Sequence, residues 1–352
     1  NLLRVCSITK FFILSHFPAM FIIETYTTAV LFSAITMICW GSWANTQKLA
    51  SSSWRFELFY WDYVIGIVLL SLIFAFTLGS SGAQGRSFIA DLQQADLSSL
   101  SSAFWGGIVF NAANILLGAA ISISGMAVAF PVGIGLALVI GVAVNYAQNP
   151  IGDVGLLFGG VALVILAILL NASAYRSLPK DQTKSPTKGL ILSIVAGILM
   201  GFFYKYVADA MFLDFTQPLP GKLSPYSAVV LFSLGIFGSN FLFNTLLMRR
   251  PFVGTPVSYS DYFQGSFKTH LTGILGGIIW CVGMAFSIIA SDMAGPAISY
   301  GLGQGATMVA AFWGVYVWKE FKALPASKHI LLKMMFILFL LGIGLIVYSK
   351  LV

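Results

Sequence analysis

The stretch GPAISYGLGQG, residues 295–305, is the best starting point for predicting the fold because an earlier part of the chain carries the same pattern. A shift of 170 residues lays it on GMAVAFPVGIG, residues 125–135, with three glycines matching. The same shift lays GGIVFNAANI, residues 106–115, on GGIIWCVGMA, residues 276–285. Glycines in lipid-facing proteins commonly serve close helix packing, and this explanation stays open for the glycines alone. The repetition itself predicts a chain built from two halves with the same plan.

Composition identifies the surroundings of these halves. Of the 352 residues, 58% are hydrophobic and only 9% are charged, so the surface would be insoluble in water. The net charge of +7 resides in short segments between apolar runs rather than on one dense basic face. We therefore expect a polytopic membrane protein in contact with lipid, with no nucleic-acid partner.

Apolar runs of about 20 residues, the length that crosses the hydrocarbon core, occur ten times. No connection between them is long enough for a separate domain, which predicts an all-α membrane protein of ten transmembrane helices. The expected spans are residues 27–46, 59–79, 103–121, 125–146, 154–174, 189–208, 226–247, 271–290, 295–317 and 330–349.

The spans divide into two repeats of five, residues 20–175 and 189–352, joined by a basic linker at 176–188. Residues 1–19 are interpreted as an upstream extension or disordered N-terminus, with Met20 as the start. Because five is odd, the second repeat enters the membrane from the opposite side, which gives an inverted repeat. Secondary transporters often have this plan, with the substrate bound near the midplane between the repeats.

Lysine and arginine lie mainly in the connections that follow the odd-numbered spans. The positive-inside rule then places both termini outside and the linker in the cytoplasm. The expected location is a cell membrane crossed many times, namely a bacterial inner membrane.

Several motifs add a resemblance to a known family. CWGSWANTQKL (residues 39–49), YWDY (60–63), the 125–141 run GMAVAFPVGIGLALVIG and GILGGIIWCVGMAFSIIAS (273–291) resemble the drug/metabolite transporter superfamily. Within it the chain looks most like the glucose/ribose porter and ureide permease branch, which is similar to the rhamnose–proton symporters. The resemblance implies a ten-span carrier that imports small polar solutes with protons. Plant ureide permeases carry a long central segment with a phosphate-loop-like motif, whereas this chain has only the linker, so no nucleotide or other cofactor is expected.

Polar and aromatic residues within the spans are the candidates for substrate binding, because polar groups in hydrocarbon tend to face the bundle interior. Amides and hydroxyls both donate and accept hydrogen bonds, which suits a sugar or a ureide or nucleobase-like solute. Indole faces offer stacking surfaces. An alternative for each asparagine is a hydrogen bond between helices. The candidates are Trp40, Trp43, Asn45, Asn111, Asn114, Asn240, Trp280, Tyr300 and Gln304.

Asp62 and Lys205 are the candidates for proton coupling. A carboxylate near a cavity can take up and release a proton, and Lys48 is close enough along the chain to pair with Asp62. Lys205 has two interpretations. It either forms a structural pair with Asp209 at i,i+4 spacing, or points inward and senses the proton state of a carboxylate.

The sequence therefore predicts a secondary active transporter that imports a small uncharged polar solute with protons by alternating access. An exporter of drugs or metabolites on the same scaffold is the alternative. A membrane enzyme is not expected: the histidines are far apart in sequence, and no metal or nucleotide motif is present, such as HExxH or GxxxxGK[ST].

Overall fold

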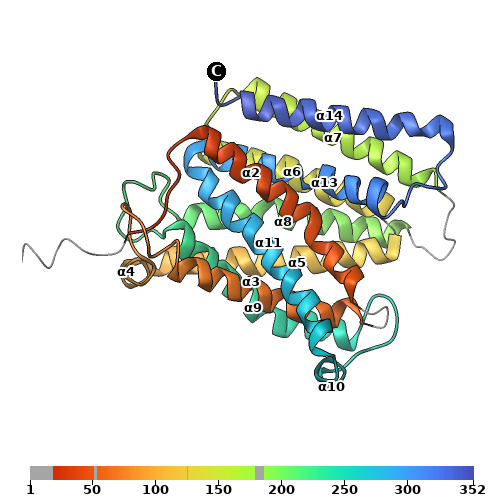
Figure 1. Cartoon of the computed structure of the whole chain (residues 1–352), viewed down its shortest axis with the longest axis horizontal. Helices are drawn as coiled ribbons and strands as arrows, with labels where there is room; N and C mark the ends of the chain where they lie inside the picture. Colours follow the sequence, from red (N-terminus) through yellow and green to blue (C-terminus); the bar gives the residue numbers. More distant parts are fainter. Residues whose placement is uncertain (1–18, 51–53, 125, 179–185) are drawn as a thin grey trace, which may run out of the picture.

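The computed structural model describes residues 19–50, 54–124, 126–178 and 186–352, and within these ranges the chain is helical (Figure 1). Residues 1–18 of the expected extension and 179–185 of the expected linker lie outside the described residues. The helices are α2 Tyr26–Ser42, η1 Trp43–Leu49, α3 Phe56–Phe76, α4 Phe88–Gln94, α5 Leu97–Ser124, α6 Met126–Gln148, α7 Val154–Arg176, α8 Pro186–Ala210, α9 Pro225–Arg249, α10 Tyr259–Phe263, α11 Phe267–Ala294, α12 Pro296–Gly303, α13 Ala306–Phe312, η2 Trp313–Val317, η3 Ala326–Lys328 and α14 His329–Tyr348.

Nine of the described helices are long and apolar enough to cross a membrane. They coincide with nine of the ten expected spans. The remaining span, residues 295–317, is interrupted: α12 has 8 residues and α13 has 7, and neither alone reaches across the hydrocarbon core. The all-α membrane fold is confirmed, with one crossing built from short helical pieces.

Local sequence explains where several long helices begin. Asp153 caps α7 by accepting a hydrogen bond from the backbone N–H of Leu156. Ser224 and Ser266 cap α9 and α11 in the same way. These caps satisfy backbone donors that the first helical turn leaves free.

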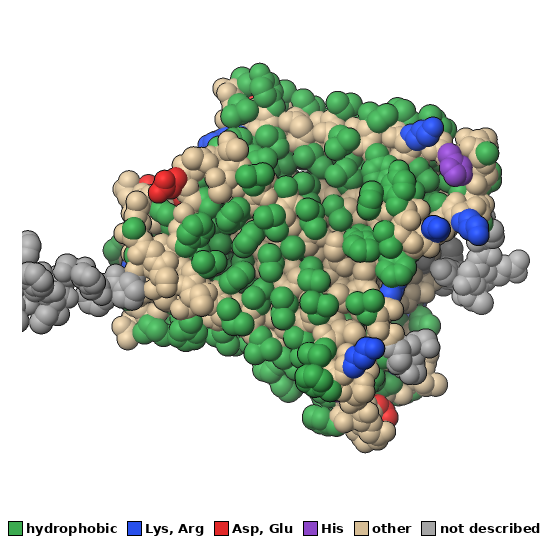
Figure 2. All heavy atoms as spheres, viewed as in Figure 1, with side chains coloured by type: hydrophobic (Ala, Val, Ile, Leu, Met, Phe, Trp, Pro, Cys, Tyr) green, Lys and Arg blue, Asp and Glu red, His purple; other side chains and the backbone are tan. Residues whose placement is uncertain are grey.

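The outside of the bundle is apolar. Figure 2 shows hydrophobic side chains spread over one broad face, with most charged side chains toward the two ends of the bundle. Leu31, Ile73 and Leu340, on three different helices, are each more than half exposed. In water such a surface would be unfavourable, whereas in a bilayer it contacts lipid chains.

Contacts between helices repeat when the two halves are exchanged. The first helix of one half, α2, packs on α11 and on the α12–α13 segment, as its counterpart α8 packs on α5 and α6. Likewise α3 packs on α11, as α9 packs on α5, while α7 pairs with α14. This exchange is the contact pattern of two copies related by a pseudo-twofold axis, in agreement with the inverted repeat.

Close helix crossings follow the same exchange. A Cβ on Gly107 of α5 would collide with the carbonyl oxygen of Phe232 in α9. A Cβ on Gly277 of α11 would collide with the carbonyl oxygen of Tyr63 in α3. Since Gly107 and Gly277 are matched by the sequence shift, the repeated glycines allow equivalent backbones to approach closely in both halves.

Candidate functional site

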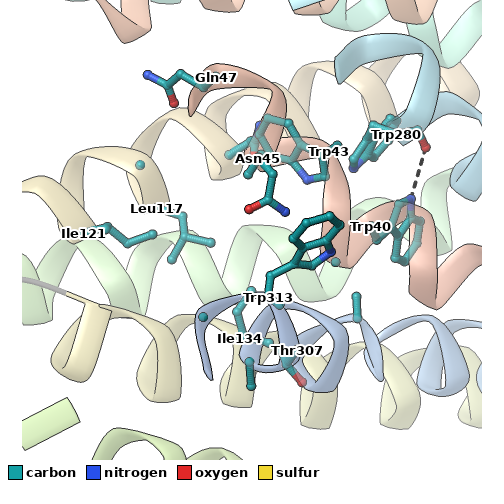
Figure 3. A pocket seen from close by; sticks show the side chains of 18 of the residues that line it. Trp40, Trp43, Asn45, Gln47, Leu117, Ile121, Ile134, Trp280, Thr307 and Trp313 are labelled. Atoms are coloured by element: carbon teal, nitrogen blue, oxygen red, sulfur yellow. Dashed lines mark hydrogen bonds between the residues drawn. The ribbon is translucent and has the colours of Figure 1, made fainter. Parts of the chain in front are cut away.

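A cavity of about 460 Å³ lies between the two halves. Its described walls come from α2, η1, α3, α5, α6 and α7 of the first half and from α8, α11, the α12–α13 segment and η2 of the second. Figure 3 shows Asn45, Trp43, Thr307 and Trp313 around its open space. The side chains deep in the cavity are buried, whereas Lys48 and Trp318 at its rim are exposed. The cavity therefore opens at the end of the bundle that carries Lys48.

Aromatic rings form the floor of the cavity. Trp40 and Trp280 are stacked with 5.9 Å between ring centroids, and Phe110 lies 4.6 Å from Trp280. The Trp40 indole N–H donates to the Trp280 carbonyl at 3.3 Å, as Figure 3 shows. Trp40 therefore offers a solute mainly its ring face, which suits stacking on a flat solute.

Gln304 supplies an amide to the cavity wall and is only 7% exposed. It follows the last residue of α12, and the helix restarts at Ala306. The flanking Gly303 and Gly305 fit closely against α2, where a Cβ at Gly303 would meet the Trp40 ring. Among the described residues no hydrogen bond joins the Gln304 side-chain amide to another protein group, and the amide borders the open space of the cavity. The amide is therefore free to bind a solute in the cavity.

Asn45 and Asn114 also line the cavity, but neighbouring residues already hold them. Asn45 donates to the Ser42 carbonyl at 2.9 Å and accepts from the Trp318 indole N–H at 2.6 Å. Asn114 donates to the Tyr60 hydroxyl at 3.0 Å. Trp43 and Trp280 complete the predicted residues that the structure brings to the cavity.

Three predicted substrate contacts lie away from the cavity lining. Asn111 is buried and hydrogen-bonds the Tyr60 hydroxyl and Ser239. Tyr300 is buried and donates to backbone carbonyls of α6 and α8. Asn240 is fully buried, and no hydrogen-bond partner for its amide is found among the described residues. Asn111 and Tyr300 thus form hydrogen bonds between helices, the alternative to substrate binding that applies to polar residues within spans.

The polar partners of Asp62 differ from the one predicted from its position in the sequence. Lys48 forms its ion pair with Glu320, so the expected Asp62–Lys48 pair is wrong. The carboxylate of Asp62 instead faces His270, whose Nδ1 lies 2.9 and 3.0 Å from its two oxygens, and accepts from the Tyr262 hydroxyl at 2.6 Å. Lys48 lies at the end of η1 beside the segment that follows η2, whereas Asp62 lies near the start of α3 and faces α11.

Tyr262 lies outside the membrane-spanning helices, in α10. Burial, followed by its hydrogen bond to Asp62, raises the pKa of Tyr262 well above its usual value. The phenol therefore keeps its proton at ordinary pH and remains a donor to Asp62.

Lys205 forms the i,i+4 ion pair with Asp209 that its spacing predicts. Gln148 donates to the same aspartate at 2.8 Å. None of these three residues is part of the described cavity lining. The structural interpretation of Lys205 thus agrees with its observed contacts.

Sequence reasoning missed several cavity residues. Asn171 of α7 lines the wall, and its buried Oδ1 is without a partner among the described residues. The sequence could have indicated Asn171, since it is a polar amide inside the apolar run 154–174. Tyr175, Trp313 and Glu320 gave no such signal because they lie near the ends of their spans, where aromatic and charged residues are common.

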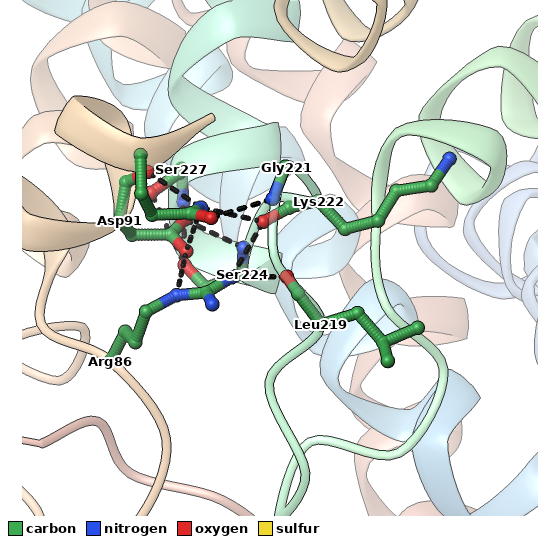
Figure 4. Close-up of polar contacts among 8 residues, drawn as sticks. Arg86, Asp91, Leu219, Gly221, Lys222, Ser224 and Ser227 are labelled. Atoms are coloured by element: carbon green, nitrogen blue, oxygen red, sulfur yellow. Dashed lines mark hydrogen bonds and ion pairs between the residues drawn. The ribbon is translucent and has the colours of Figure 1, made fainter. Parts of the chain in front are cut away.

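At the opposite end of the bundle a polar cluster joins two connections (Figure 4). Arg86, just before α4, lies 3.0 Å from the buried carboxylate of Asp91 and donates to the carbonyls of Leu219 and Lys222 in the α8–α9 loop. Asp91 also accepts from the backbone N–H of Ser224 at 2.7 Å. The cluster joins a connection of the first half to one of the second, and no described residue of either connection lines the cavity.

Comparisons with known proteins agree with this architecture. The family model described as Ureide permease matches residues 59–188 and 180–349. Ureide permease 1 of Arabidopsis thaliana is 22% identical over 94% of this chain and 99% of its own length. Ureide permease 2 of the same plant is 22% identical with the same coverage. Probable ureide permease A3 of Vigna unguiculata is 25% identical over 47% of this chain and 45% of its own.

A protein of known crystal structure has the same fold, with a TM-score of 0.55 at 12% identity, covering 90% of this chain and 96% of the other. The fold and these matches define a multi-pass membrane transporter, not an enzyme. The chain belongs to the ureide permease family. The wider superfamily, the sugar porter branch and the bacterial inner membrane stay predictions, and the relatives named above come from plants.

Proposed function

We propose that this protein imports a small uncharged ureide or nucleobase-like solute together with protons by alternating access. One observation carries the proposal: a cavity has walls from both repeats, is open at one end, and has no residue of the Arg86–Asp91 cluster in its described lining. In the orientation predicted from the basic residues, the open end faces the cytoplasm. The structure then corresponds to an inward-open state.

The chemistry of the cavity favours a flat, neutral solute. Trp40, Trp280 and Phe110 offer ring faces, while Gln304 offers both a donor and an acceptor. A ureide or nucleobase has a planar amide-rich ring that matches both features. A sugar shares the donors and acceptors but lacks a flat π face.

Alternating access is supported by the exchange of contacts between the halves. If the halves exchange conformations, the helix contacts that now surround the open end form at the other end, as expected for inverted repeats. The Arg86 and Asp91 cluster would have to release the α8–α9 loop in that step.

Proton coupling is assigned to Asp62 with His270 and Tyr262. The same helix, α3, carries Tyr60, which hydrogen-bonds the cavity residue Asn114. Protonation of Asp62 removes the charge that faces His270, so it alters the contact between α3 and α11. Because α11 also carries Trp280, this contact links the proton site to the cavity floor.

The proposal is tested by uptake into proteoliposomes of labelled allantoin, uracil and glucose, with and without an inward proton gradient. Uptake of allantoin or uracil that rises with the gradient is the expected result. Uptake of glucose alone would contradict the substrate class. Efflux driven by an opposing proton gradient, without uptake, would favour the exporter.

Asp62→Asn tests the coupling site separately. The variant should lose gradient-driven accumulation while solute exchange in the absence of a gradient persists, since the amide keeps the volume and cannot lose a proton. Glu24→Gln, at a carboxylate outside the helices, serves as the control and should behave as the original protein. Equal loss of accumulation and exchange in Asp62→Asn would assign Asp62 to folding or binding.

A further inference from the structure

Two opposite charges meet at the mouth of the cavity. The Lys48 ammonium lies 3.0 Å from a carboxylate oxygen of Glu320, and the two side chains are 44% and 33% exposed. Among the described lining residues these are the only charged ones. They come from η1 in the first half and from the segment after η2 in the second, so the pair spans the opening between the halves.

Neighbouring side chains hold both members of the pair in place. The Tyr175 hydroxyl of α7 donates to the other oxygen of Glu320 at 2.7 Å. The Lys48 ammonium lies 4.2 Å from the centroid of the Trp318 ring, and the Trp318 indole N–H donates to Asn45. An exposed pair usually adds little to stability, so these fixed positions point to a role other than strengthening the fold.

The pair controls the electrostatic potential that a solute meets on entry. Without Glu320, Lys48 would attract anionic solutes, because a fixed ammonium beside a low-dielectric cavity interacts strongly with the carboxylate of a solute. Glu320 at 3.0 Å cancels most of that potential. A neutral solute is unaffected by the cancellation, whereas an anionic one loses the interaction that would offset its desolvation.

We infer that Glu320 is a specificity-determining residue, which neutralises Lys48 so that the cavity selects uncharged solutes. Tyr175 positions Glu320, and Trp318 positions Lys48. This inference deepens the proposed function and rests on it for the solute class. The geometry of the pair itself does not depend on which neutral solute is carried.

The potential at the mouth can be measured without a substrate. Ala310, a small residue of α13 in the cavity wall, is changed to cysteine in a chain whose Cys6, Cys39 and Cys281 are replaced by serine or alanine. Its labelling rate is then compared between a sulfonate-bearing and a trimethylammonium-bearing methanethiosulfonate. Glu320→Gln should raise the anionic-to-cationic rate ratio by about three- to tenfold, and Lys48→Gln should lower it by a similar factor.

A second measurement uses competition binding to the purified protein with allantoin, which is neutral, and allantoate, its ring-opened anion. Glu320→Gln should improve allantoate relative to allantoin, whereas Lys48→Gln should weaken it. If Glu320→Gln and Lys48→Gln instead change the labelling ratio and the allantoate-to-allantoin affinity ratio in the same direction and by the same factor, the pair has only a structural role and the inference is overturned. If the original protein binds neither compound, the ureide proposal fails, while the labelling ratios still decide the role of the pair.

Discussion

The helix α6 and the α12–α13 segment occupy equivalent places in the two repeats, yet only one of them is continuous. α6 runs unbroken from Met126 to Gln148 with Pro131 inside it. Its counterpart ends α12 at Gly303 and restarts as α13 at Ala306. The proline, which removes a backbone donor, did not break its helix, whereas the glycine-flanked Gln304 lies at a break.

The two repeats share their helix packing but differ in the side chains that they contribute to the cavity. The repeat shift matches Gln304 with Ile134, and both side chains line the same cavity. One repeat contributes an amide and the other an aliphatic side chain at equivalent positions. Duplicated packing thus surrounds a cavity whose lining is not duplicated, and substitutions at matched positions can test this asymmetry.

The largest effect is expected at position 304. Gln304→Leu removes the amide that borders the cavity, so binding of a neutral ureide should weaken about tenfold to hundredfold, the equivalent of one or two lost hydrogen bonds to the solute. Ile134→Leu, the matched control, should change binding less than about threefold, because the swap conserves volume. Calorimetric titration of both variants checks this, and a Gln304→Leu protein with unchanged affinity would assign Gln304 to packing.

An intermediate effect is expected at Gly133 and Gly303, which the repeat shift matches. A Cβ at Gly303 would lie 2.7 Å from a ring carbon of Trp40, while a Cβ at Gly133 would lie 2.7 Å from a terminal methyl of Leu117. The indole is wedged in the cavity floor and the methyl can rotate, so Gly303→Ala should destabilise the protein by about 1–3 kcal/mol and Gly133→Ala by less than about 1 kcal/mol. Thermal unfolding in detergent measures both, and a reversed order would contradict the packing described for α12.

The smallest effect is expected at Gly135 and Gly305, a further pair of matched glycines. A Cβ at Gly135 meets open space, whereas one at Gly305 meets the flexible Met37 side chain, Ile343 and the carbonyl oxygen of Leu302. Gly135→Ala should stabilise the protein by up to about 1 kcal/mol, since alanine is the better helix former, and Gly305→Ala should destabilise it by up to about 1 kcal/mol. The same unfolding experiment applies here. A strong loss of stability in Gly135→Ala would show that α6 needs this glycine for movement or for a contact absent from the present state.

Sequence reasoning located the apolar spans well but located the site only in part. Span limits depend on runs of apolar residues that must satisfy their own backbone hydrogen bonds in lipid, and this requirement is local. Trp40, Trp43, Asn45, Asn114, Trp280 and Gln304 reach the cavity, whereas Asn111, Asn240 and Tyr300 do not. All of these residues are polar or aromatic within a span, so the sequence offered no means of separating them.

Ion-pair partners were the least predictable feature. Lys48 pairs across 272 positions with Glu320, and Asp62 faces His270 across 208 positions. Lys205 and Asp209, four residues apart on one helix, were predictable because helix geometry alone brings them together. Nearness along the chain identifies partners within a helix, and it fails where the chain turns.

The sequence alone is enough to place this protein in a membrane, and it predicts ten crossings in two repeats of opposite orientation. These predictions depend on chain length per crossing, the parity of five and the matched glycines. Only the folded arrangement shows which polar residues share a cavity, where one predicted crossing breaks and which charges neutralise each other. The reason is physical: bilayer thickness acts on each helix separately, whereas the rotation and tilt that bring side chains together depend on all neighbouring helices at once.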